Sequence, residues 1–159
     1  MRTSDAAEPR GSSHLVIPLT GRRKVFAYVT RITNGTPELL VLDSLDEPGH
    51  EVPKGAAEEG ESLEDAVHRE LLEETGITGV LISRQLGSTD WRDERQLFFL
   101  VEAPPGLPTA FEHVVTGGGI DAGFRYRFRW LPIDTALHDR LVQGCNRFVD
   151  ELLAAFGTA

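Results

Sequence analysis

The stretch HRELLEETGI, residues 68–77, places three glutamates at the end of a predicted helix. With residues spaced at 100° around a helical wheel, Glu70 and Glu74 fall on the same side as Leu71, and Glu73 borders that side. Like charges three and four residues apart repel each other, and a carboxylate turned towards a core loses hydration. Because the arrangement costs stability, it indicates a functional cluster rather than a solvated acidic face.

Capping signals on both sides of the cluster predict a helix over residues 62–75. Ser62 is a suitable N-cap, and Asp65 three residues later approximates a capping box. Gly76 suits the left-handed position behind the last turn, with Ile77 placed for a hydrophobic contact. The wheel assigns Asp65, His68 and Arg69 to the solvated side of this helix, with Glu64 at its margin.

Three carboxylates gathered in this way are suited to binding a hard divalent cation. Ligands that are all oxygen favour Mg²⁺ or Mn²⁺ over zinc. Cys145 is the only cysteine, so an intrachain disulfide and a multi-cysteine metal site are both excluded. We therefore expect Mg²⁺ or Mn²⁺ as the cofactor.

The spacing around the cluster matches a family motif. Gly55 is followed after five residues by Glu61, and seven further residues separate Glu61 from Arg69, which opens the run RELLEETGI. The 23 residues 55–77 match the Nudix box, GX5EX7REUXEEXGU, at every fixed position. The chain thus resembles the Nudix (MutT-like) hydrolases. The resemblance implies an α/β fold, a Nudix-type α/β/α sandwich with a mixed sheet and a loop-helix-loop catalytic motif.

The resemblance also implies a reaction, the hydrolysis of a nucleoside diphosphate linked to another moiety by metal-assisted attack of water. Candidate substrates are nucleoside triphosphates (including oxidised ones), dinucleoside polyphosphates, nucleotide sugars and ADP-ribose. A different hypothesis is a Nudix domain that binds nucleotides as a sensing or regulatory module without turnover. The intact REXXEE core argues against that hypothesis, because a binding module does not need every catalytic carboxylate.

Roles for single residues follow from the same resemblance. Glu70, Glu73 and Glu74 are implied to ligate the metal, helped by a backbone carbonyl of Lys54 or Gly55. Arg69 is implied to hold the carboxylates in place through Glu61. Members of the family differ in their general base. Glu73 is the first choice inside the box, and the candidates outside it are Glu112 and Asp121, which flank a predicted glycine-rich turn but which ordinary solvation would also explain.

Three further motifs suggest substrate contacts. Lys54 in VPKG resembles the PKG entry of Nudix enzymes that act on dinucleoside polyphosphates, although a surface lysine is the alternative. In FRYRFRW the aromatic residues alternate with Arg125, Arg127 and Arg129. This arginine row either grips a polyphosphate or forms the wet face of a half-buried strand. Trp91 in DWRDERQ either stacks a base or belongs to a charged turn.

Periodicity and turn residues predict the remaining elements. Strands are expected over residues 14–19, 24–32, 38–44, 80–88 and 95–103, with a hairpin formed by residues 111–116 and 124–133. Residues 45–61 are expected to form a loop. A closing helix is predicted over residues 139–156, with an apolar stripe of Leu141, Cys145, Phe148, Val149 and Leu152.

Composition narrows the class of protein. The chain of 159 residues has a net charge of −9, which argues against broad binding of nucleic acids or anionic membranes. Residues 1–13 are polar and predicted to be a disordered tail, and residues 14–159 a single domain. Without a signal peptide or an apolar run of membrane-spanning length, a cytoplasmic location is expected. The expected partner is a small nucleoside diphosphate derivative, and a homodimer is possible.

Overall fold

The computed structural model describes residues 21–158. The predicted tail over residues 1–13 and the predicted strand over residues 14–19 lie outside this range. Among the described residues, no helix is both long and apolar enough to span a membrane.

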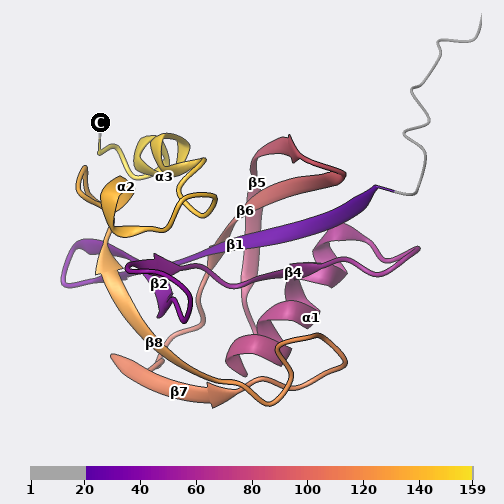
Figure 1. The fold of residues 1–159 in the computed structure, drawn as a ribbon. Coiled ribbons are helices and arrows are strands. Elements are labelled where there is room, and N and C mark those ends of the chain that lie inside the picture. Colours follow the sequence, from indigo (N-terminus) through magenta and orange to yellow (C-terminus); the bar gives the residue numbers. More distant parts are fainter. Residues whose placement is uncertain (1–20, 159) are drawn as a thin grey trace, which may run out of the picture.

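One mixed sheet of eight strands organises the described chain (Figure 1). Its main order is β5-β6-β1-β2-β8-β7, with β3 paired to β2 and β4 paired to β1. The pair β1–β6 is parallel, whereas the other named pairs are antiparallel. The strands are β1 (Arg22–Thr33), β2 (Thr36–Asp43), β3 (His50–Glu51), β4 (Lys54–Ala56), β5 (Leu81–Trp91), β6 (Glu94–Glu102), β7 (Ala110–Val114) and β8 (Arg125–Pro132).

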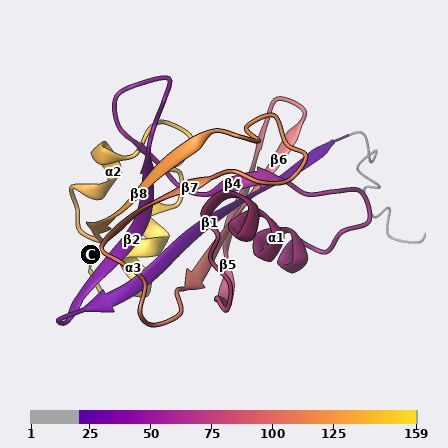
Figure 2. The same ribbon diagram turned by 90° about the horizontal axis from the view of Figure 1, so that it is seen from below.

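Helices cover both faces of this sheet, with α1 (Leu63–Thr75) on one side and α2 (Leu137–Arg140) and α3 (Val149–Ala155) on the other (Figures 1 and 2). The alternation of β1 explains the two layers, because successive side chains point to opposite faces. Val25 and Val29 join the hydrophobic cluster under α1, whereas Phe26 and Tyr28 join the cluster under the C-terminal helices. The α/β fold and its sandwich of layers are therefore confirmed.

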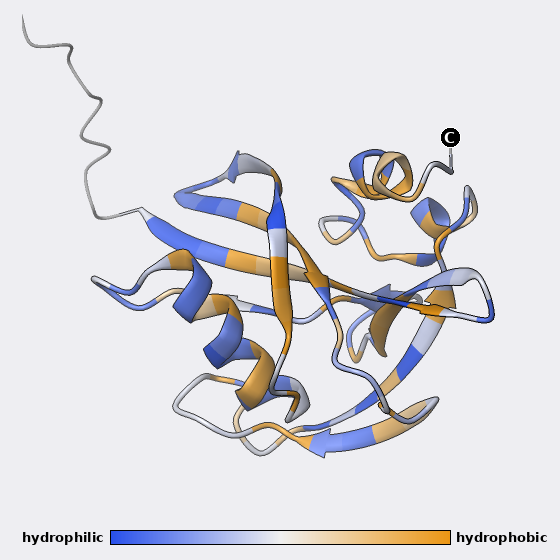
Figure 3. Ribbon diagram, turned by 180° about the vertical axis from the view of Figure 1, so that it is seen from behind, coloured by the Kyte–Doolittle hydropathy of each residue, from blue (hydrophilic) through white to orange (hydrophobic). Residues whose placement is uncertain are grey.

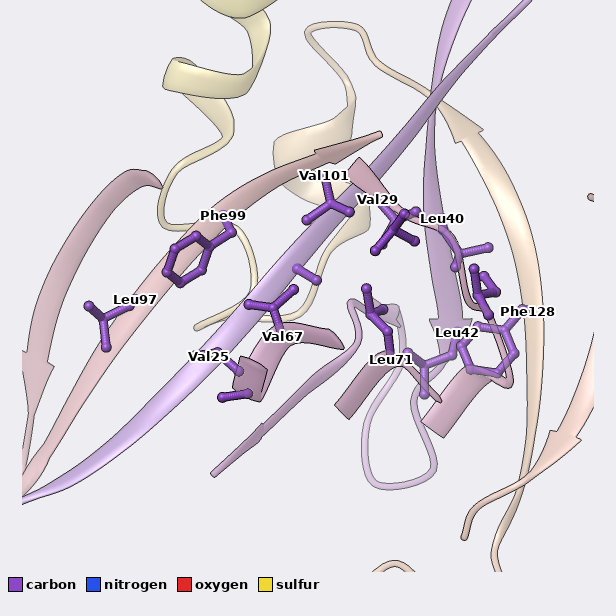
Figure 4. Close-up of a cluster of buried hydrophobic side chains, with 14 of the residues drawn as sticks. Val25, Val29, Leu40, Leu42, Val67, Leu71, Leu97, Phe99, Val101 and Phe128 are labelled. Atoms are coloured by element: carbon purple, nitrogen blue, oxygen red, sulfur yellow. The ribbon is translucent and has the colours of Figure 1, made fainter. Parts of the chain in front are cut away.

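The cluster under α1 brings Val67 and Leu71 of the helix against the central strands (Figure 4). Figure 3 shows the corresponding hydrophobic bands in the middle of the strands and the mixed character of α1. Ser62 caps the helix by accepting a hydrogen bond from the Asp65 N–H at 3.1 Å. Gly76 ends it in the left-handed conformation, with φ of 75°. The predicted boundaries of this helix are thus correct to within one residue.

The predicted closing helix is wrong as a continuous element. The chain forms only the short helices α2 and α3, and the segment between them is not helical. Leu141 adopts an extended conformation and forms a β-bridge with His50, whose carbonyl accepts a hydrogen bond from the Val142 N–H at 2.8 Å. Gly144, with φ of 98°, adds a left-handed residue. Pairing with β3 overrides the helical periodicity, although most of the predicted apolar stripe is buried.

The buried phenol of Tyr28 fixes this non-helical segment to the sheet. Its hydroxyl donates a hydrogen bond to the Cys145 carbonyl at 2.6 Å and accepts one from the Phe148 N–H at 3.3 Å. Smaller differences from the expected elements concern the predicted loop 45–61, which contains β3 and β4. Strand β5 also extends to Trp91, so the turn into β6 is shorter than the charged motif suggested.

Candidate functional site

The site is built where β4 meets α1. Gly55 pairs with Val25 of β1, which places β4 against the helix. A Cβ atom at Gly55 would lie 2.0 Å from the carboxyl carbon of Glu70, so only glycine allows that carboxylate to approach the strand. Burial raises the pKa of Glu70, although hydrogen bonding to Arg69 opposes the shift.

Arg69 is the centre of the hydrogen-bond network on α1. Its guanidinium binds both oxygens of Glu61, at 2.8 and 2.9 Å, and also contacts Glu70 at 2.9 Å and Glu73 at 3.3 Å. A further hydrogen bond reaches the Ala56 carbonyl at 2.9 Å. These bonds from Arg69 lower the pKa of Glu61 to about 2. The wheel placed Arg69 on the solvated side, but the reach of its side chain to Glu61 makes it half-buried.

Glu74 is the most deeply buried of the three glutamates, with 4% of its surface exposed. This desolvation raises the pKa of Glu74 to about 8, helped by the charges of Asp121 and Glu70 and opposed by Lys54. Near neutral pH the protonated form of Glu74 is therefore favoured, because the positive charge of Lys54 does not offset the effect of burial. The helical wheel correctly predicted that this side chain points inward.

The glycine-rich loop between β7 and β8 packs against the C-terminal end of α1. The Glu73 carbonyl accepts a hydrogen bond from the Thr116 N–H at 2.9 Å, and Nε2 of His113 lies 3.1 Å from the same oxygen. Gly117 lies directly over the Glu73 side chain, since a Cβ atom there would be 2.4 Å from its carboxyl carbon. With φ of 92°, Gly117 also adopts a backbone conformation that favours glycine. The loop is therefore fitted closely to Glu73.

Asp121, at the far end of this loop, acts electrostatically on two carboxylates of α1. Its charge raises the pKa values of both Glu70 and Glu74, after the larger effect of burial. The Tyr126 hydroxyl lies 3.4 Å from an Asp121 carboxylate oxygen. Four carboxylates, from one helix and one loop, thus influence one another electrostatically.

Glu112 and the arginine row lie elsewhere. Strand alternation places Glu112 on the opposite face of β7 from His113, the residue that contacts α1. Glu112 pairs there with Arg125 and Arg127, each at 3.2 Å, while Arg129 pairs with Asp43 at 2.9 Å. All three arginines are exposed, so the structure does not bring this row, or Glu112, to the glutamates.

A pocket of about 360 Å³ lies on the face of the sheet that is covered by the C-terminal segment, opposite the face that packs against α1. Lys54 lines it and forms an ion pair with Glu51. Because Lys54 also affects the pKa of Glu74, it links the pocket to the cluster on α1. The lining is mixed: besides Lys54 it includes the cations Lys24 and Arg147, the carboxylates Glu47 and Glu51, the aromatic residues Phe26 and Trp91, and also Gln96 and Cys145.

The donor set fits a hard divalent cation in its chemistry. Glu70, Glu73 and Glu74 supply only oxygen, and the buried Glu74 carboxylate would gain from added positive charge. Because residue 55 is glycine, no side chain of that residue displaces the Glu70 carboxylate. Within residues 21–158, however, no three acidic, histidine or cysteine side chains already converge as metal ligands. Glu70 and Glu73 instead share Arg69 in the ligand-free chain.

Comparison with known proteins identifies the family. The NUDIX domain model matches residues 21–152, which is most of the chain. The chain therefore belongs to the Nudix family. The curated proteins include a relative from Bacillus subtilis (strain 168) with the name "Putative 8-oxo-dGTP diphosphatase", which is 37% identical over 71 residues. That match covers 43% of this chain and 47%, about half, of the relative.

Solved structures show the same fold at low identity. A MutT structure from work on Aliivibrio salmonicida and Vibrio cholerae has a TM-score of 0.58 at 24% identity, and covers 84% of this chain and 98% of that one. An Ap4A hydrolase of C. elegans has a TM-score of 0.59 at 18% identity, covering 86% and 98%. A mutT/nudix family protein from Listeria innocua has a TM-score of 0.56 at 20% identity, covering 86% and 94%.

Sequence reasoning missed several residues around the site. Arg23 donates to the Glu61 carbonyl at 2.8 Å and so fixes the loop before α1. Tyr126 was assigned only to the aromatic face of β8, and its contact with Asp121 depends on the path of the loop between β7 and β8. The pocket lining could not be assembled because it joins distant segments. Its signals in the sequence were Lys54 in VPKG and the polar motif that contains Trp91.

Proposed function

We propose that the chain is a divalent-metal-dependent pyrophosphohydrolase that cleaves a nucleoside diphosphate linked to another moiety. The observation that supports this most directly is the hydrogen bonding of Glu61, Glu70 and Glu73 to one arginine, Arg69, beside the buried Glu74, at a helix end that costs stability. Such a cluster suits a polyphosphate substrate only if positive charge accompanies it. Family membership supports the same reaction class.

We propose Glu70, Glu73 and Glu74 as the residues that hold Mg²⁺ or Mn²⁺, with a backbone carbonyl at Lys54 or Gly55. Such an ion would supply positive charge for the diphosphate oxygens and would lower the pKa of the water that it binds. Arg69 keeps the carboxylates oriented through its two hydrogen bonds to Glu61. Loss of Arg69 would leave these carboxylates repelling one another without a shared donor.

We propose Glu73 as the general base, with Asp121 as the candidate outside the box. Glu74 is too enclosed for this role, and Glu70 is committed to Arg69 and to the strand beside Gly55. Glu73 is also near Arg69, but at the longer distance of 3.3 Å. Asp121 is a better candidate for the general base than Glu112, because Glu112 is paired with arginines on the outer face of β7.

Lys54 is proposed to contact the substrate phosphates, because it lies between the pocket and Glu74. The pocket would then hold the nucleoside or the moiety beyond the diphosphate, and its volume of about 360 Å³ suits a group of that size. The name of the Bacillus subtilis relative makes oxidised deoxynucleoside triphosphates the first substrates to test. Dinucleoside polyphosphates such as Ap4A come second, because the structural likeness concerns only the fold.

A substrate panel with identified products tests this proposal. The purified chain is incubated with 8-oxo-dGTP, Ap4A, a nucleotide sugar and ADP-ribose, with Mg²⁺, with Mn²⁺ or with EDTA. We expect a nucleoside monophosphate among the products of at least one compound, only when metal is present. Tight nucleotide binding without turnover on the whole panel would instead support a regulatory module.

A further inference from the structure

A buried amide in the pocket has one of its two polar atoms unused. Gln96 of β6 lines the pocket and has only 6% of its surface exposed. Its Nε2 donates a hydrogen bond to Glu94 at 2.9 Å. Its Oε1 is buried and has no hydrogen-bond partner among residues 21–158. A buried acceptor without a partner costs free energy, so this atom calls for a physical explanation.

Glu94 fixes which atom of the amide remains available. A carboxylate only accepts hydrogen bonds, so it must face the NH₂ group of Gln96 rather than its oxygen. Turning the amide over would bring Oε1 against a carboxylate oxygen at hydrogen-bond distance, and the two would repel. The Gln96 side chain therefore offers an acceptor, and not a donor, towards its remaining surroundings.

The rim of the same pocket provides an aromatic surface. Trp91 is 44% exposed and is one of the pocket-lining residues. The Arg92 guanidinium lies 4.3 Å from the centroid of the Trp91 ring. An aromatic ring of this kind stacks well against a planar heterocycle. The Phe26 and Phe98 rings are stacked with their centroids 4.3 Å apart, on the same face of the sheet as Gln96. Both rings belong to the hydrophobic cluster under the C-terminal helices.

We propose that Gln96 is a specificity-determining residue, whose Oε1 accepts a hydrogen bond from an amino group of a nucleotide base held in this pocket. The inference rests on the proposed function, because it takes the substrate to be a nucleotide whose diphosphate lies towards Lys54. Oε1 is closed to solvent. The contact therefore forms when the half-exposed rim rearranges around the base, and a base without the matching donor leaves Oε1 unpaired.

Metal-free binding to matched nucleotides tests this proposal. Calorimetric titrations in EDTA compare GDP with IDP, which lacks the 2-amino group, and ADP with the purine riboside diphosphate, which lacks the 6-amino group. We expect the wild-type chain to prefer the amino-bearing member of one pair by about tenfold, the worth of one good hydrogen bond. In Gln96→Met, which keeps the side-chain length without polar atoms, this preference should fall to within about twofold of unity.

Two other variants make the test specific. Gln85→Met changes an exposed glutamine of β5 that does not line the pocket, and it should retain the wild-type preference. Glu94→Gln leaves Gln96 in place but removes the carboxylate that orients its amide, so it should weaken the preference even if Gln96→Met fails to fold. A thermal melt of each variant accompanies the titrations.

The outcomes separate this inference from the proposed function. Equal binding within both pairs by the wild-type chain, or a preference that Gln96→Met and Glu94→Gln both retain, would overturn the role of Gln96. That result would leave hydrolysis untouched, because the titrations contain no metal. Conversely, a base preference that depends on Gln96 in a chain without metal-dependent turnover would uphold the specificity role while contradicting the hydrolase.

Discussion

The two faces of the sheet differ in the interactions that their buried side chains make. On the α1 face, Glu70 and Glu74 are held near the core together with the charge of Arg69, at a cost in desolvation and repulsion. On the C-terminal face, an irregular segment is held by apolar contacts and by the buried hydroxyl of Tyr28. The first face gives up stability for a concentration of charge, and the second supplies stability and one wall of a pocket. Substitutions on the two faces should therefore separate activity from stability.

Glu74→Gln should give the largest effect, with opposite signs for activity and stability. We expect turnover to fall more than about 100-fold, since even partners of metal ligands cost 10- to 100-fold when they are lost. The melting temperature in EDTA should rise by at least about 3 °C near pH 8, because a buried charge is removed. Steady-state kinetics and scanning calorimetry measure the two quantities. A variant that is both active and no more stable would contradict the account of this residue.

The gain in stability from Glu74→Gln should depend on pH with a defined sign. The folded-state pKa of Glu74 is raised to about 8 from an ordinary value of 4.5. Between these values the folded chain retains a proton that the unfolded chain has lost, so stability falls as pH rises through this window. The advantage of Glu74→Gln should therefore grow from pH 5 to pH 8. A constant advantage over this range would show that titration of Glu74 does not cause it.

Gly55→Ala should be the next most damaging change to activity. The new Cβ would meet the Glu70 carboxylate at 2.0 Å, so the carboxylate must move. Displacement of a group in the site by about 1 Å costs on the order of 100-fold in rate. Gly118→Ala is the matched control, since a Cβ there meets no atom within 4 Å. Comparable activity of the two variants would contradict the role given to the space beside Glu70.

Gly87→Ala tests the opposite face, where stability should respond instead. A Cβ at Gly87 would lie 2.0 Å from the Phe148 ring. Overpacking of this kind costs about 1–3 kcal/mol of unfolding free energy. Urea denaturation should show that loss, while turnover by the folded fraction stays within about threefold of wild type. A large loss of turnover without destabilisation would mean that the two faces are not separable in this way.

Arg127→Ala should have the smallest effect. The Arg127 side chain is 73% exposed and pairs with Glu112 at 3.2 Å on the outer face of β8. Such surface ion pairs contribute about 0–1 kcal/mol. Activity on the preferred substrate should change less than about twofold, a smaller effect than any above. A strong increase in KM would instead restore the arginine row as a substrate contact.

The same contrast explains how much the sequence could reveal. The α1 region is encoded locally, since Ser62, Gly76 and the glutamate spacing define the helix and the inward direction of Glu74 without reference to the rest of the chain. The C-terminal segment depends on distant partners. Its periodicity indicated one helix, but the bridge between Leu141 and His50 could not be read from neighbouring residues.

The path of the loop between β7 and β8 could not be predicted from the sequence either. Glu112 and Asp121 were equivalent candidates because both flank the glycine-rich turn. Strand alternation places Glu112 on the outer face, whereas the return of the loop over Glu73 brings Asp121 towards Glu70 and Glu74. The bulk of the pocket escaped prediction for the same reason, because it joins β1, β4, β6 and the C-terminal segment.

The central claim is that the carboxylates of α1 carry out metal-dependent hydrolysis, and Glu73→Gln tests it most directly. Initial rates are measured on the best substrate of the panel, across a Mg²⁺ titration, for wild type and variant. We predict a fall in kcat of roughly 10²- to 10⁴-fold, the range for loss of a general base. The fold, followed by circular dichroism and melting temperature, should be retained. Unchanged kcat and unchanged Mg²⁺ dependence in a folded variant would contradict the claim.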